Sequence, residues 1–119
     1  MTNRPQLVHS TSDGIKTDID PVPSWVHVIP RQDGKLPTTE DGRRWQWLRL
    51  DTITKIYAEV ALSGIDVADH QYQIVVVASG EQYHPTKLLL DGNESGMAEF
   101  RLMELVNAAM RKVAVPASP

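Results

Sequence analysis

The residues of this chain most suited to chemistry form a short basic and aromatic segment. Arg43, Arg44 and Arg49 are interleaved with Trp45 and Trp47 within seven residues. Guanidinium groups can contact phosphates while indole rings stack on bases, so such segments bind single-stranded nucleic acid or anionic surfaces. In the competing interpretation, which we favour, the tryptophans pack within a sheet and the arginine stems lie over them. Nucleic acid is an unexpected partner for a chain with a formal net charge of -3.

A second group of polar residues falls in one predicted loop and comprises Asp66, Asp69 and His70. Carboxylate and imidazole ligands can hold a divalent metal ion. Loops also collect such residues for turn formation, and no HExxH motif or repeated His–acid spacing is present. We regard the three residues as weak candidates and predict neither a metal nor a cofactor.

Nucleophilic catalysis has little support in the sequence. The chain has no cysteine, which removes thiolate chemistry, disulfides and zinc ribbons. It also has no Gly-x-Ser-x-Gly elbow and no glycine-rich phosphate loop. We therefore predict a non-enzymatic binding or adaptor module that acts through protein–protein contact. The alternative is a small-ligand-binding protein or enzyme with a pocket between helix and sheet, lined by Tyr57, Tyr72, His84 and Trp47.

The elements that position these residues are predominantly strands. Side chains alternate over residues 43–50 and again over residues 56–62, with an interruption at Asp51-Thr52, and period-two alternation is typical of half-buried strands. Residues 25–29 and 72–78 are further predicted strands. The middle of the latter is apolar on both faces, which favours an interior position in the sheet.

A last strand is expected between Gln82 and Leu90. Pro85 cannot donate a hydrogen bond to a neighbouring strand, which places residues 83–86 at a sheet edge or a bulge. An exposed edge near Pro85 would offer a surface for a peptide or for self-association.

A helix is predicted over residues 93–113, where apolar residues recur at three- and four-residue spacing. Asp91 or Asn93 supplies the N-terminal cap. The apolar side is unusually broad because Phe100, Met103 and Met110 widen it. This width motivates a homodimer hypothesis, with contact through the helix face or an edge strand.

Together the elements predict an α+β fold, a bent and mostly antiparallel sheet of five to six strands closed by one C-terminal helix. The 119-residue length suits one domain, which we place at residues 24–115. Residues 1–23 contain Pro5, Pro21 and Pro23 with few apolar residues, and they are expected to form a flexible tail. The sequence shows neither a signal-peptide core nor an apolar run of membrane-spanning length, so we expect a soluble, cytoplasmic protein.

Three segments carry a resemblance to a known superfold: residues 47–56, which include Ile53-Thr54-Lys55-Ile56, then residues 72–78, then the helix at 100–113. In this order they resemble the pleckstrin-homology-like superfold as found in bacterial proteins. The resemblance implies a bent antiparallel roll whose open corner is plugged by the terminal helix. It does not imply lipid headgroup binding, because no Lys-x-Lys/Arg signature is present. The other architecture considered is a plain α+β meander with one helix on one face.

Overall fold

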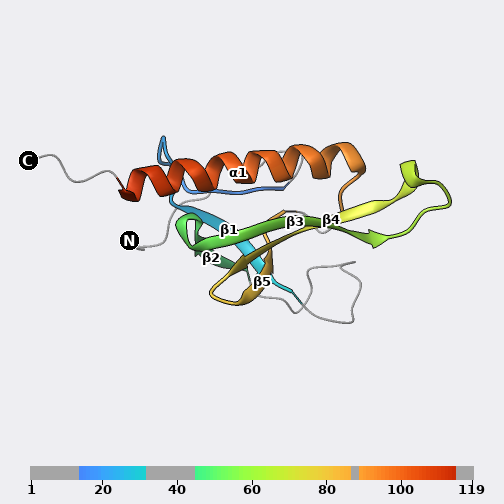
Figure 1. The fold of residues 1–119 in the computed structure, drawn as a ribbon, viewed down its shortest axis with the longest axis horizontal. Coiled ribbons are helices and arrows are strands. Elements are labelled where there is room, and N and C mark those ends of the chain that lie inside the picture. The colour runs from blue at the N-terminus through green and yellow to red at the C-terminus, as the bar shows by residue number, and fades with distance from the viewer. Residues whose placement is uncertain (1–13, 32–44, 87–88, 115–119) are drawn as a thin grey trace, which may run out of the picture.

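The computed structural model describes residues 14–31, 45–86 and 89–114, which form five strands and one long helix (Figure 1). The elements in chain order are β1 (Trp25–Pro30), β2 (Gln46–Arg49), β3 (Ile53–Leu62), β4 (Gln71–Ala78), β5 (Glu81–His84) and α1 (Gly92–Ala114). A single turn of 3-10 helix, Leu50–Thr52, separates β2 from β3, where the alternation of the sequence is interrupted. The α+β class and the single C-terminal helix are confirmed.

The strands form one open antiparallel sheet in the order β2-β1-β5-β4-β3. The β3–β4 hairpin is its longest pairing, with Tyr57 opposite Val75 and Ala58 opposite Ile74. β1 pairs with β2 through residues 25–28, but with β5 only through Ile29 and Pro30. Since all the strand pairings of this sheet are antiparallel, each strand can present one face to a core and the other away from it.

The position of β5 corrects the prediction of an edge near Pro85. β5 lies between β1 and β4, and it ends at His84. Pro85 therefore follows the strand and removes no hydrogen bond from it, and its side chain is buried. The outermost strands of the sheet are instead β2 and β3.

α1 begins with a reciprocal pair of hydrogen bonds. The backbone N–H of Glu94 donates to Asp91 Oδ1 at 2.7 Å, and the backbone N–H of Asp91 donates to Glu94 Oε1 at 3.0 Å. This arrangement is a capping box, which satisfies amide groups that have no partner within the helix. Of the two caps that the sequence offered, Asp91 is the one used.

α1 lies along one face of the sheet (Figure 1) and buries a narrower stripe than its sequence predicts. Leu102, Val106 and Ala109 are buried against the sheet core, together with Val26, Val28, Leu50, Ile53, Ile74, Val76, Ala78 and Tyr83. Phe100, Met103 and Met110, which were expected to widen the stripe, are at least half exposed, and so are Met97 and Val113. One helix on a sheet contacts it along a single line, which leaves its flanks uncovered.

The described part of the expected N-terminal tail, residues 14–23, contributes to the core. Ile15 is fully buried, and Thr17 forms a bridge with Val26 of β1. At the other end of the segment, Lys112 Nζ donates to Ser24 Oγ at 2.9 Å and to the Val22 carbonyl at 3.0 Å. One buried apolar residue and a short backbone pairing thus hold residues 14–23 against the sheet. Residues 1–13 lie outside the described residues.

Among the described residues, no helix combines the length and the sustained apolar content that crossing a bilayer requires.

Candidate functional site

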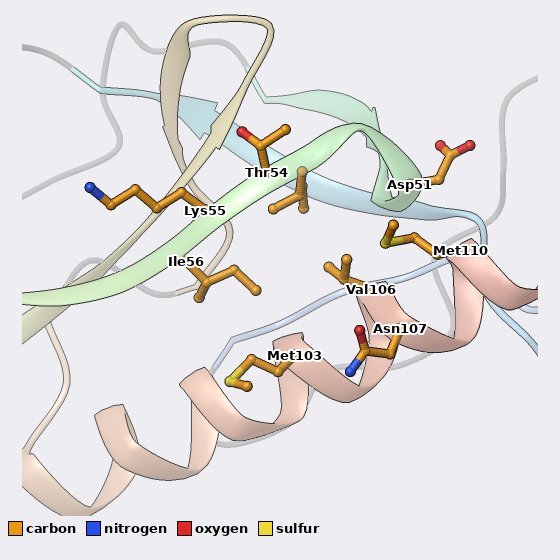
Figure 2. Close-up of a pocket in the computed structure, with 9 residues that line it drawn as sticks. Asp51, Thr54, Lys55, Ile56, Met103, Val106, Asn107 and Met110 are labelled. Carbon is orange, nitrogen blue, oxygen red and sulfur yellow. The ribbon is translucent and has the colours of Figure 1, made fainter.

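A groove of about 500 Å³ lies between the beginning of β3 and the C-terminal half of α1 (Figure 2). Its lining is mainly apolar and comes from both elements: Asp51, Ile53, Thr54, Lys55 and Ile56 on the strand side, and Met103, Val106, Asn107 and Met110 on the helix side. Figure 2 shows Ile56 directed toward the helix, with Met103, Val106 and Met110 facing the strand. The groove is therefore a feature of the contact between helix and sheet.

Helical spacing places the methionines on this side of α1. Met103 and Met110 are seven residues apart, so they lie on the same flank two turns from each other. Both side chains are about half exposed, whereas Val106 between them is buried at the floor. Unbranched thioether side chains adapt their shape to different apolar partners. The helix thus gives the groove an adjustable apolar wall.

The other wall is the outermost strand of the sheet. Within the described part of the chain, β3 pairs only with β4, through all but two of its ten residues. A strand at a sheet edge presents unpaired N–H and C=O groups, which can accept another strand. An unpaired edge and an apolar groove thus lie side by side over residues 53–56.

On the sheet face away from α1, β3 presents a short row of polar side chains. Lys55 Nζ lies 5.2 Å from the centre of the Tyr57 ring, and Gln82 Nε2 donates to the Tyr57 hydroxyl at 3.0 Å. The Arg31 guanidinium donates two hydrogen bonds to the Glu59 carboxylate, the longer of 3.2 Å. Lys55, Tyr57 and Glu59 therefore form an ordered positive, aromatic and negative series along the edge strand.

The basic and aromatic segment is only partly within the described residues, since Arg43 and Arg44 lie outside them. Trp45 stacks on His27 with ring centres 4.8 Å apart, and Trp47 lies 5.0 Å from the same ring. Arg49 lies over Trp25 at 5.8 Å. The half-buried tryptophans thus pack against β1 on the expected common face, as the packing interpretation requires. Binding of an anionic partner there stays a prediction.

The structure does not bring the predicted pocket residues together. Tyr57 and Tyr72 lie on opposite faces of the β3–β4 hairpin, because Tyr72 is opposite Val60, three residues from Tyr57. His84 is 2% exposed, and its Nδ1 donates to the Ile74 carbonyl oxygen at 2.8 Å. A groove does lie between helix and sheet, but Tyr57, Tyr72, His84 and Trp47 are not among its lining residues.

Asp66, Asp69 and His70 are held in the β3–β4 loop by local hydrogen bonds. The backbone N–H of Gly64 donates to His70 Nδ1 at 3.0 Å, and the backbone N–H of Asp69 donates to the Asp66 carbonyl at 2.9 Å. Over the described residues, no group of three or more His, Asp or Glu side chains could hold a metal ion. These contacts are those of a turn.

Tyr83, which lies outside the groove, has a raised pKa. The Tyr83 hydroxyl donates to Glu81 Oε2 at 2.8 Å. This hydrogen bond, with burial and the negative charge of Glu81 as smaller causes, raises the pKa of Tyr83 above its ordinary value of 10.0. A tyrosine that stays protonated and donates to a carboxylate has a structural role here, as it joins two residues on the same face of β5.

The sequence led to a pocket between helix and sheet, but not to the residues that line the groove. Its helix side includes two residues noted only for widening the apolar stripe, Met103 and Met110, together with Asn107. The sequence does contain an indication of the groove. Two methionines seven residues apart lie on one flank of the helix, and a flank wider than the buried stripe leaves apolar surface uncovered. Which strand that flank would face depends on the strand order.

Comparison with known proteins does not assign the chain to a family. No family model and no solved structure matches it. Part of the chain is similar to 3-phosphoshikimate 1-carboxyvinyltransferase from Salmonella typhimurium (strain LT2) and from Salmonella newport (strain SL254), at 30% identity over 69 residues in each case. The similarity covers 53% of this chain but 16% of each enzyme. The chain thus spans a small fraction of the length of the curated relatives that it matches.

Proposed function

We propose that this protein is a binding module that acts through protein–protein contact at the groove between β3 and α1. One observation carries the proposal: over the described residues the outer edge of β3 has no strand partner, and this edge borders an apolar groove of about 500 Å³. Strand addition uses such an edge for backbone hydrogen bonds and a neighbouring groove for alternate side chains. An extended protein segment would meet both requirements at once.

The chemistry of the groove indicates what such a segment presents. Ile53, Ile56 and Val106 supply apolar surface, and Met103 and Met110 can adjust to side chains of different shape. Every second residue of an added strand points to one face. The preferred segment therefore has apolar residues at alternate positions, with no proline where the backbone must pair.

A small apolar ligand is the second candidate, since the volume falls within the usual range for ligand pockets, about 300–1,000 Å³. Polar groups that could orient such a ligand, Asp51 and Asn107, also line the groove. A small ligand, however, would leave the ten-residue edge of β3 unused. The protein segment accounts for both features and is the stronger proposal.

The proposal is tested by selecting peptides from a random displayed library on sparsely immobilised protein. We expect selected peptides to alternate apolar residues and to lose at least about tenfold in affinity when Met103→Glu and Met110→Glu are combined, since burying each methionine is worth roughly 1.5–3 kcal/mol. Met97→Glu is the matched control, because Met97 is 65% exposed on the same helix and does not line the groove. Failure to select any peptide, or equal binding to all variants, would argue against the groove as a protein-binding site.

A further inference from the structure

The face of β3 away from α1 has a charge pattern that is complementary to itself. Lys55 and Glu59 lie two residues on either side of Tyr57, and the side chains of all three share that face. Within one chain the two charges are about four strand residues apart, roughly 13 Å, so they do not pair with each other. Glu59 is instead held by Arg31.

We infer that the segment received by the β3 edge is β3 of a second copy of this chain, in an antiparallel register centred on Tyr57. This inference rests on the proposed function and names the partner of the same site. Two identical strands related by a two-fold axis must run antiparallel and make the same contacts twice. In the Tyr57-centred register, Lys55 of each copy lies opposite Glu59 of the other, with side chains about 4.5–5.5 Å apart at Cβ.

The opposite face of the same register borders the groove. Ala58 of one copy lies opposite Ile56 of the other, and Ile56 lines the groove of that copy. Val60 is 45% exposed in the single chain, an apolar side chain on the core-facing side of β3. Pairing with a second copy would cover part of this side chain. The two sheets would join into one continuous sheet with both helices on the same face.

The charge pattern also excludes neighbouring symmetric registers on physical grounds. A register centred on Ala58 would bring the two Ala58 side chains together and place Lys55 opposite Ala61, leaving Glu59 opposite Tyr57. A register centred on Ile56 would place Glu59 opposite Ile53. Only the Tyr57-centred register pairs opposite charges directly, and such pairs fix register more strongly than they add affinity.

Charge exchange tests the inference by analytical ultracentrifugation. The wild type is expected to sediment as a dimer, and Lys55→Glu and Glu59→Lys should each weaken dimerisation about tenfold, because like charges then lie opposite each other twice per dimer. An equimolar mixture of the two variants should restore association, since all-acidic and all-basic strands complement each other. Arg111→Glu is the control for net charge, as Arg111 is exposed on α1 away from β3.

Two results would overturn the inference. A monomeric wild type at all concentrations removes the second copy as partner, while peptide selection at the groove still decides the proposed function independently. The Tyr57-centred register is also excluded if neither Lys55→Glu nor Glu59→Lys weakens the dimer, or if mixing the two variants does not restore association. If circular dichroism shows that Glu59→Lys is unfolded without Arg31 as its partner, the comparison of Lys55→Glu with Arg111→Glu decides the question.

Discussion

At the scale of single residues, the sequence indicates which side chains share a face and does not show which residues from another strand they touch. Alternation placed Trp45 and Trp47 together, and both contact one histidine. That histidine, His27, is distant in the sequence, and its position between the rings follows from the β1–β2 register. Local pattern has no information on such a register, because it is set by turn geometry and by the packing of both strands.

The Tyr83–Glu81 hydrogen bond gives a prediction about stability and pH. The raised pKa of Tyr83 means that the folded state favours the protonated hydroxyl, so its contribution to stability is complete below the unfolded pKa and is lost as the pH rises through the folded pKa. Tyr83→Phe should therefore lower the free energy of unfolding by about 0.5–1.5 kcal/mol near neutral pH. The difference from wild type should shrink above about pH 10. Urea denaturation over that range measures it, and a difference that grows with pH would contradict this assignment.

At the scale of elements, strands and the helix were predictable where their apolar periodicity is long. The β3–β4 hairpin and α1 both extend over enough residues for the two periods to be distinguished. The sheet edge predicted near Pro85 was wrong. Proline lacks a backbone N–H, which suggested an unpaired strand, but β5 ends at His84, one residue before the proline. The order of strands in a sheet is set by packing between distant segments, and the position of one proline does not reveal it.

Replacement of glycine by alanine is expected to have opposite effects on stability at Gly64 and at Gly96. A Cβ on Gly64 would lie 2.2 Å from Asp69 Cβ and 2.6 Å from the Asp69 backbone carbon, so Gly64→Ala must displace the β3–β4 loop at a cost of about 1–3 kcal/mol. A Cβ on Gly96 meets nothing within 4 Å, and Gly96→Ala should stabilise α1 by about 1 kcal/mol. Thermal unfolding of the two variants checks both signs. Equal shifts in the melting temperature would show that the loop is not packed as described.

At the scale of the whole molecule, the α+β class and the C-terminal helix followed from the sequence, whereas the residues that line the groove did not. The lining of a groove depends on which strand the helix flank faces, and the strand order β2-β1-β5-β4-β3 leaves β3 outermost, beside that flank. The self-complementary order of Lys55, Tyr57 and Glu59 was readable in the sequence. Its meaning depended on β3 being an edge strand.

Disulfide formation between copies of the chain tests the pairing of β3 with a second copy. The chain contains no cysteine, so Tyr57→Cys introduces a single thiol. In the proposed register the two introduced residues lie directly opposite each other, close to the Cβ separation of about 3.5–4.5 Å that a disulfide needs. Thr52→Cys and Ser63→Cys are matched controls, because both residues are exposed and lie five and six residues from Tyr57, which would put each roughly 30 Å or more from its own copy.

Mild oxidation followed by non-reducing electrophoresis gives the result. We predict rapid cross-linking of Tyr57→Cys to a dimer, with little cross-linking of the two control variants. Equal cross-linking at all three positions, or none at Tyr57→Cys, would contradict pairing of β3 with a second copy.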